Sequence, residues 1–362
     1  MNIKLIFKKI LIVLCDLVIA GILLCVFAFF HHVLPRKGNL DNIVMIPKPS
    51  ASATGFQFPV FGDETPMQTA TPAATDNFSV PPGENSSAEV TAEATALVTA
   101  VPTQTIAATP TATDTQRFPV QDEDSYMSEN VVVNMSTVQM GSGRSLVTYH
   151  VADIYIRDIE CLRSAFADMI YGENFTQSVL EQDRDNNAIV AISGDSYGMG
   201  DAGVVLRNGI LYKYEPTTED ICVLYYDGRM ETLSFGEYTR ESLVEGGAYQ
   251  VWTFGPGLLD DNGKAKSSFN AGDYIMKAHP RASIGYYSPG HYVFVLVDGR
   301  QDKYSAGLDI KGLAKLYEEL GCKVAYNLDG GISAVMTFND EIYSHPARTR
   351  EVTDIIYIGE KL

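Results

Sequence analysis

Cysteine is scarce in this sequence, and no two cysteines are close enough to form a recognisable motif. There are five in 362 residues, and two of them, Cys15 and Cys25, lie in an apolar N-terminal stretch. The other three, Cys161, Cys222 and Cys322, are widely spaced and form no CxxC motif. This spacing excludes zinc ribbons, thioredoxin-like redox motifs and a disulfide framework. We therefore expect the thiols to be buried apolar side chains rather than nucleophiles.

Positive charge is also in short supply. The 27 Lys and Arg residues face 45 Asp and Glu residues, which gives a formal net charge of −18. A chain this acidic repels phosphate backbones, so we predict no nucleic-acid partner, although a local basic pocket for one phosphate is compatible with the charge.

Histidine is rare as well, with six residues and no HxH motif. His279 and His291 are too far apart for a pair of ligands on one helix. The sequence therefore signals no metal site and no cofactor, and only a divalent cation bound by carboxylates stays open.

One long apolar run is present, at residues 10–30, after three lysines within the first nine residues. Its length suffices for a helix across a bilayer, which needs about 20 residues. The lysines favour a cytoplasmic N-terminus, and the end of the run, FFHH, is a poor cleavage site. We predict a single-pass signal-anchor over residues 1–36 in the cell membrane, with the rest of the chain outside the cytoplasm. A cleaved signal peptide is the alternative.

The composition changes to Thr, Ala, Pro and Ser between about residues 47 and 116, and no Lys or Arg occurs between Lys48 and Arg117. Such a segment buries too little apolar surface to offset its ordering entropy. We predict a flexible spacer over residues 37–117, which holds a folded domain, residues 118–362, away from the outer surface.

Tight-turn signals recur in the folded domain. Asn208-Gly209, Asp227-Gly228 and Asn262-Gly263 each stand between two extended runs, a pattern typical of antiparallel hairpins. Two helices are also expected, one from near Asp158 and one over residues 309–320. The first would have one apolar face, formed by Ile159, Leu162, Phe166, Met169 and Ile170. The mixture predicts an α+β fold, a mixed and largely antiparallel sheet with a few packing helices.

Three apolar, strand-like runs are each followed by a carboxylate next to glycine. AIVAIS precedes Gly194-Asp195, YVFVLV precedes Asp298-Gly299, and VAYNL precedes Asp329-Gly330-Gly331. Such strand ends deliver charged groups to a rim of the sheet, where glycine lets a ligand approach the backbone. A single Asp-Gly is common in ordinary turns, but three together indicate a site.

Three arginines accompany these carboxylates. Arg281 follows His279-Pro280, Arg300 follows Asp298-Gly299, and Arg350 precedes the last apolar strand. Guanidinium groups suit bidentate contact with carboxylate or phosphate. Together with the aspartates they indicate sugar-phosphate chemistry, and surface salt bridges are the alternative.

Several motifs occur in the order found in a known family: AISGDSYG, GVVLRNGILYK, FGPGLLDDNGK, HPRASIGYYSPGHYVFVLVDGRQ, NLDGGISAVM and TREVTDIIYI. This order, over residues 189–358, resembles phosphodiester glycosidase domains. The family includes N-acetylglucosamine-1-phosphodiester α-N-acetylglucosaminidase, and bacterial relatives are often labelled exopolysaccharide biosynthesis proteins. The chain departs from the family pattern at four positions, Ser193, Ile332, Ala334 and Val335. A β-branched residue at position 332 would be strained if that position needs a positive φ.

The resemblance implies hydrolysis of a sugar 1-phosphodiester at the anomeric C–O bond. A phosphate leaving group is weakly basic, so it needs charge stabilisation more than proton donation. The candidate catalytic carboxylates are Asp329, Asp298 and Asp195, with Asp329 preferred because it stands between an apolar strand and a glycine pair. The groups expected to bind phosphate or sugar are Arg281, Arg300, Asn327, Gly330, Gly331, Ser333 and Arg350.

Two other interpretations stay open. The four departures from the family pattern are compatible with a domain that binds glycan without cleaving it. GDSYG also fits G-x-S-x-G, with Ser196 as the nucleophile of a serine hydrolase and His345 following in chain order. A hairpin, not the expected helix, is predicted after this motif, which counts against the serine hydrolase.

Overall fold

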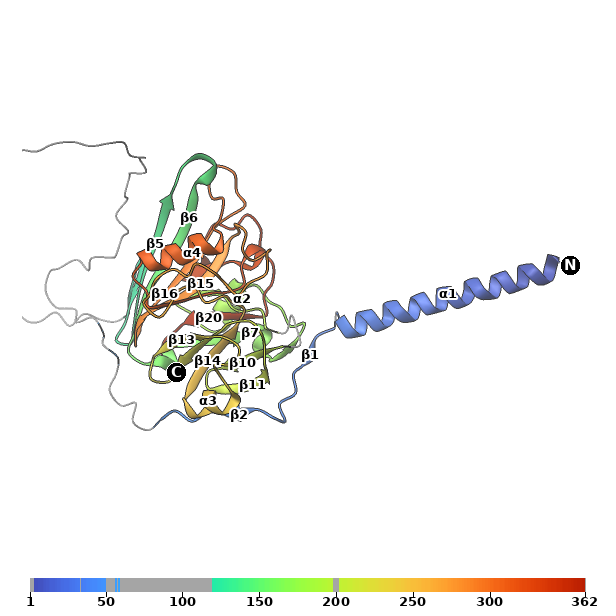
Figure 1. The fold of residues 1–362 in the computed structure, drawn as a ribbon, viewed down its shortest axis with the longest axis horizontal. Helices are drawn as coiled ribbons and strands as arrows, with labels where there is room; N and C mark the ends of the chain where they lie inside the picture. The colour runs from blue at the N-terminus through green and yellow to red at the C-terminus, as the bar shows by residue number, and fades with distance from the viewer. Residues whose placement is uncertain are drawn as a thin grey trace, which may run out of the picture. The chain divides into compact units, whose positions relative to one another are not determined.

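The computed structural model describes residues 3–32, 34–49, 56, 58, 119–197 and 202–361, drawn in colour in Figure 1. These residues belong to one compact unit, which comprises residues 1–64 and 118–362. Its sheets are antiparallel and its helices are few, which confirms the predicted sheet-rich α+β class.

Helix α1, Ile3–His32, contains the apolar run predicted from the sequence. The stretch Val13–Phe30 has a mean hydropathy of 2.8, and none of it is buried inside the protein. Its length and composition fit a membrane span and a signal sequence alike.

A seven-stranded sheet carries two of the three predicted carboxylates. Its order is β17-β15-β16-β6-β5-β4-β3. The bounds are β3 Val120–Gln121, β4 Ser125–Met127, β5 Val131–Met140, β6 Val147–Ile156, β15 Arg281–Ser288, β16 His291–Val297 and β17 Val324–Asn327. Because β15 pairs antiparallel with both β16 and β17, those two strands run parallel and end at the same edge. Asp298 and Asp329 follow these two ends.

A six-stranded sheet has the order β13-β12-β14-β10-β11-β2. The bounds are β2 Val44–Met45, β10 Gly203–Arg207, β11 Ile210–Glu215, β12 Ile221–Tyr225, β13 Met230–Leu233 and β14 Ala248–Thr253. The hairpins predicted at Asn208-Gly209 and Asp227-Gly228 are confirmed as β10–β11 and β12–β13. Asn208 and Gly209 both have a positive φ, as a type I′ turn requires. The predicted Asn262-Gly263 hairpin is reduced to a turn closed by one bridge, Leu259 to Ala265.

A five-stranded sheet, order β19-β18-β9-β20-β7, contains the Asp195 strand end. The bounds are β7 Leu162–Phe166, β9 Val190–Ser193, β18 Met336–Phe338, β19 Glu341–Ile342 and β20 Asp354–Ile358. The helix predicted from near Asp158 is wrong. Asp158 caps only a 3-10 turn, Ile159–Cys161, and the chain then continues as β7, which pairs with β20. This long-range pairing overrides the local apolar spacing that favoured a helix.

Helix α4, Ile310–Glu319, confirms the helix predicted over residues 309–320. Asp309 caps its start by accepting a hydrogen bond from the backbone of Gly312, and Gly321 follows its end with a positive φ. Its apolar side packs on the seven-stranded sheet, where α4 is seen in Figure 1. The shorter helices are α2 Val179–Asp185, α3 Arg240–Glu245, and the 3-10 turns Gly143–Ser145, Ala167–Met169 and Gly331–Ser333.

Residues 36–49 lie on the folded domain, although the prediction places residue 36 in the anchor and residues 37–49 in the spacer. Strand β1, Arg36–Lys37, pairs with β8, Gly172–Glu173, and β2 pairs with the edge strand β11. Ile46 is 3% exposed and belongs to the main core. The short apolar run IVMI, residues 43–46, supplies this packing. The spacer prediction missed the run because it averaged the composition over a much longer stretch. Except for Phe56 and Phe58, the spacer from residue 50 to 117 lies outside the described residues.

Candidate active site

Asp329 lies just beyond the end of β17, and side chains from two other segments hold its carboxylate. Oδ2 accepts hydrogen bonds from Ser196 Oγ at 2.5 Å and from an Arg350 guanidinium nitrogen at 2.9 Å. The Arg350 side chain is 40% exposed and that of Asp329 is 9% exposed, so the pair borders solvent. Oδ1 accepts no hydrogen bond from any described residue. Among the described residues, the site thus presents a carboxylate oxygen without a hydrogen bond next to an exposed cation.

Two glycines shape the loop after Asp329. Gly331 has a φ of +66°, a conformation that glycine adopts without strain. A Cβ at Gly330 would lie 2.6 Å from the carbonyl oxygen of Pro280, so no larger residue fits there. The strain considered for Ile332 is not present, because Gly331 takes the positive φ and Ile332 does not.

Arg300 and Arg350 flank this loop. The backbone N–H of Arg350 donates to the carbonyl of Ile332, and its Nε donates to Ser333 Oγ at 2.5 Å. The Arg300 guanidinium lies 3.4 Å from the ideal Cβ position of Gly331. Two cations therefore border the same short loop, an arrangement suited to a phosphate.

Arg300 is also free of any acidic partner among the described residues. Its guanidinium contacts the hydroxyl of Tyr274 at 3.1 Å and Nδ1 of His279 at 3.0 Å. Neither contact neutralises its charge, because neither partner is a carboxylate, and burial lowers the pKa of the His279 ring. Its positive charge is thus available to an anionic ligand.

Arg281 and Asn327, two of the expected ligands, are buried and bonded to the backbone. Arg281 is 2% exposed and donates to the carbonyls of Leu308, Ile275 and Lys277. Burial lowers its pKa to about 10. Asn327 donates to the carbonyl of Gly255 at 2.7 Å. In this structure both side chains brace the loops around the site.

Ser193, where the family usually has Asn, supports the same loop from β9. It is fully buried, and its hydroxyl donates to the backbone carbonyl of Asp329 at 3.2 Å. The backbone N–H of Asp329 in turn donates to the carbonyl of Gly194. These two bonds join the ends of β9 and β17, so the substitution to serine keeps the strand ends together.

Asp195 belongs to a second carboxylate–arginine group, which is closed to solvent. It pairs with Arg207 at 2.6 Å, and Arg207 pairs with Asp354 at 3.0 Å. All three side chains are at most 1% exposed. Burial and the neighbouring Asp195 raise the pKa of Asp354. The sequence analysis identified Asp195 but not Arg207 and Asp354. The only sign of these two residues in the sequence is that each is a charged residue within an apolar strand.

Ser196 connects the two groups. Its backbone N–H donates to Asp354 at 3.2 Å while its hydroxyl donates to Asp329. Its φ of +56° is uncommon for a residue other than glycine. The other member of the serine hydrolase alternative, His345, uses its backbone to contact Asp298 and packs its ring against Tyr304. The described residues therefore form no Ser–His pair.

Asp298 occupies a separate buried cluster. It is 1% exposed and accepts hydrogen bonds from His150 at 2.8 Å and Tyr304 at 3.0 Å. Burial, with Asp298 nearby, raises the pKa of Tyr304 to about 12. No described hydrogen bond joins this cluster to Asp329, so the structure brings Asp195 and Asp329 together through Ser196 but not Asp298.

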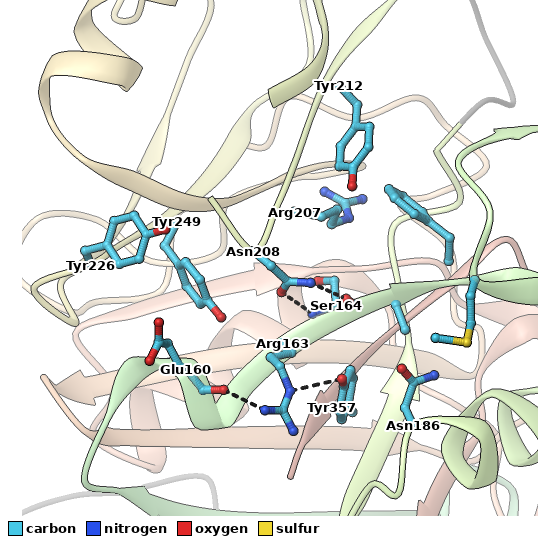
Figure 2. A pocket seen from close by; sticks show the side chains of 13 residues that line it. Glu160, Arg163, Ser164, Asn186, Arg207, Asn208, Tyr212, Tyr226, Tyr249 and Tyr357 are labelled. Carbon is cyan, nitrogen blue, oxygen red and sulfur yellow. Dashed lines mark hydrogen bonds between the residues drawn. The ribbon is translucent and has the colours of Figure 1, made fainter. Parts of the chain in front are cut away.

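Two cavities adjoin the buried ion-pair group. One, of about 390 Å³, is lined by Asp195, Ser196 and Thr253 among others. The other, of about 410 Å³, is lined by Arg207 and by several tyrosines (Figure 2). The first borders Ser196, the direct partner of Asp329, and is therefore the better candidate for part of the substrate.

The part of the chain that the structure describes contains no group of three His, Cys, Asp or Glu side chains that could hold a metal ion. Cys161, Cys222 and Cys322 are buried, and burial raises the pKa of Cys161 to about 11. A raised pKa keeps a thiol protonated and unreactive.

Comparison with known proteins agrees with this architecture. Residues 186–359 match the family described as phosphodiester glycosidase. This confirms the resemblance inferred from the motif order, over residues 186–359 of the folded part of the chain.

Two individual proteins illustrate the relationship. The catalytic domain of zebrafish N-acetylglucosamine-1-phosphodiester alpha-N-acetylglucosaminidase, auto-inhibited by its pro-peptide, has a TM-score of 0.52 and 18% identity, and the match covers 64% of this chain and 84% of that one. This likeness shows a shared fold. The SPbeta prophage-derived uncharacterized protein YomE of Bacillus subtilis (strain 168) is 29% identical over 170 residues, 45% of this chain and 26% of that protein. The match thus spans about a quarter of the length of this curated relative.

Proposed function

We propose that the chain is a membrane-anchored hydrolase outside the cytoplasm that cleaves a sugar 1-phosphodiester at its glycosidic C–O bond, in surface glycan or exopolysaccharide metabolism. The observation that carries this proposal is the solvent-facing Asp329–Arg350 pair, with Arg300 beside the same glycine loop. The match of residues 186–359 to phosphodiester glycosidases supports the reaction class. The apolar helix α1 supports the anchor.

The proposal gives each group of this site a role. Asp329 acts on the anomeric carbon, either as the nucleophile or as the base that activates water, through the oxygen that Ser196 and Arg350 leave free. Cleavage adds one negative charge to the departing phosphate as the diester becomes a monoester. Arg350 and Arg300 stabilise that charge, and the weakly basic phosphate needs no strong proton donor.

The test uses the full chain in detergent and a panel of α-linked sugar 1-phosphodiesters that includes one of N-acetylglucosamine. Free reducing sugar and the matching phosphate monoester are both measured. Wild type should release the two in equal amounts, and Arg300→Gln should reduce the rate about 100-fold, the effect of losing one charge-stabilising donor. Saturable glycan binding without release would instead support the non-catalytic alternative.

A further inference from the structure

The chain passes from α1 into the folded domain almost at once. Helix α1 ends at His32, and β1 begins at Arg36, where it pairs with β8. An extended chain spans at most about 3.6 Å per residue, so Arg36 lies within about 15 Å of the helix end. Leu34, between the two, already accepts a hydrogen bond from the side chain of Asn174 at 3.2 Å.

The next residues add a strand to the six-stranded sheet. In β2, Val44 pairs with Leu211, and Met45 pairs with Ile210. The backbone of Ile46 then donates to Gly209 at 2.7 Å and accepts from the Tyr226 hydroxyl at 3.2 Å. This is strand addition to an exposed edge, in which backbone hydrogen bonds give affinity and a buried side chain gives specificity.

Charge contacts continue the docking beyond β2. The ammonium group of Lys48 lies 3.1 Å from carboxylate oxygens of both Asp158 and Glu160. Lys48 is the last basic residue before the uncharged-to-acidic stretch. These ion pairs therefore hold the segment on the folded domain at the point where the Thr- and Ala-rich stretch begins.

Phe56 and Phe58 hold the far end of the segment. The backbone of Phe56 donates to the carbonyl of Arg157 at 3.2 Å, and the Arg157 guanidinium lies 4.3 Å from the Phe58 ring centre. A Cβ at Gly228 or Gly290 would come within 2.7 or 2.4 Å of the Phe56 side chain, so the two glycines form the hollow it occupies. After the undescribed residues 59–118, the chain is again on the domain, as β3 pairs with β4.

We propose that residues 36–49, together with Phe56 and Phe58, form a docking strand that holds the catalytic domain directly at the outer face of the membrane. The Thr-, Ala- and Pro-rich stretch then does not serve as the tether of the domain, because described residues on both sides of it contact the domain. The inference rests on the proposed membrane anchor and on the proposed activity. It narrows the substrate class to sugar phosphodiesters attached to lipid, because the reaction then takes place next to the bilayer.

Cutting the chain within the Thr-, Ala- and Pro-rich stretch shows whether that stretch or the docking strand holds the domain at the membrane. A site for a sequence-specific protease is placed between residues 80 and 100 of the full chain, which is reconstituted in phosphatidylcholine vesicles and cleaved. The C-terminal fragment should sediment with the vesicles after complete cleavage. Its release into the supernatant would overturn the docking proposal. Uncut chain that fails to sediment would instead contradict the anchor.

Paired variants identify the residues responsible. Ile46→Asp buries an unpaired charge in the core, so its fragment should be released after cleavage. Met45→Asp, at a neighbouring position that is 75% exposed, should leave the fragment bound. Equal retention of both variants would overturn the assignment of the docking strand. In the uncut wild type, the Ile46 amide should exchange slowly with deuterium, and fast exchange would contradict its hydrogen bond to Gly209 even if Ile46→Asp misfolds.

Activity provides an independent readout of substrate class. Released Ile46→Asp fragment should hydrolyse a water-soluble sugar phosphodiester at the rate of bound wild type, but hydrolyse a vesicle-embedded lipid phosphodiester at least tenfold more slowly. Equal rates on the embedded substrate would contradict the lipid-linked class. No activity of wild type on either substrate would contradict the proposed function, and the sedimentation result would still stand.

Discussion

Two carboxylate–arginine groups lie at neighbouring strand ends, and they differ in almost every physical respect. In the first, Arg350 is 40% exposed and contacts one oxygen of Asp329. In the second, Arg207 lies between Asp195 and Asp354, with all three buried. Ser196 touches both groups through hydrogen bonds. The same residue types therefore occur in two different environments, joined by one serine.

Under the proposed function, the difference in burial separates a reactive group from a structural one. Removing charges from water costs several kcal/mol per ion, so a buried group persists only if each charge is paired. The Asp329–Arg350 pair, in which the arginine is exposed, should contribute little to stability, about 0–1 kcal/mol, and one of its carboxylate oxygens accepts no hydrogen bond from a described residue. We expect the buried group to control folding and the exposed pair to control activity.

The largest expected effect concerns the buried group. Arg207→Met leaves two buried carboxylates without a cation, which should lower the free energy of unfolding by about 3–5 kcal/mol. Denaturant unfolding followed by circular dichroism measures the change. A loss below about 1 kcal/mol would contradict the proposed difference between the two groups, because the buried group would then contribute no more to stability than the Asp329–Arg350 pair.

The opposite pattern is expected at Arg350. Arg350→Gln should lower kcat/KM about 100-fold, since it removes a donor to the developing phosphate charge. Its free energy of unfolding should change by no more than about 1 kcal/mol, the usual value of an exposed pair. Arg348→Gln, at an exposed arginine two residues away, is the matched control and should alter neither quantity.

Ser196 tests the connection between the groups. Ser196→Ala removes one hydrogen bond to Asp329, worth about 1 kcal/mol, so activity should fall about five- to tenfold. A serine hydrolase would instead lose nearly all activity. It would also label Ser196 with a fluorophosphonate probe, and such labelling would contradict the present assignment.

A pH dependence is expected at Asp183, a buried carboxylate to which no described cation is bonded. Burial raises the pKa of Asp183 to about 7, and its Oδ1 accepts a hydrogen bond from Thr337. The folded state therefore keeps this proton while the unfolded state loses it above its ordinary pKa of 3.8. Asp183 should lower stability progressively as pH rises from about 4 to about 7, with no further change above.

Asp183→Asn removes that titration. The melting temperature of the variant should fall less between pH 4 and pH 7 than that of wild type, measured by scanning calorimetry. If the melting temperatures of the two proteins change with pH in parallel, Asp183 has an ordinary pKa in the folded state. Burial alone would then not distinguish the structural carboxylates from the reactive one.

Local signals were sufficient for part of this architecture. Asn208-Gly209 and Asp227-Gly228 specify their own turns, and α4 has both its apolar stripe and its end signals within one short segment. The strand-end aspartates were likewise visible as Asp beside Gly. Each of these features depends on residues adjacent in sequence.

The features that were missed depend on distant residues. Strand β7 forms because β20 pairs with it, although its apolar spacing alone favours a helix. The ion pairs of Arg207 with Asp195 and Asp354 cannot be read from the sequence, because they form only when two sheets bring the three residues together. Composition likewise concealed the docking of Ile46, since four apolar residues precede a long polar stretch.

The most direct test of the account compares Asp329→Asn with Asp302→Asn, which removes an exposed carboxylate from the loop that carries Arg300. The release of reducing sugar from a sugar 1-phosphodiester is measured for each full-length variant, with circular dichroism to confirm folding. We predict that Asp329→Asn loses more than about 100-fold in rate while folded, and that Asp302→Asn keeps the wild-type rate. A folded Asp329→Asn protein with unchanged activity would contradict the account.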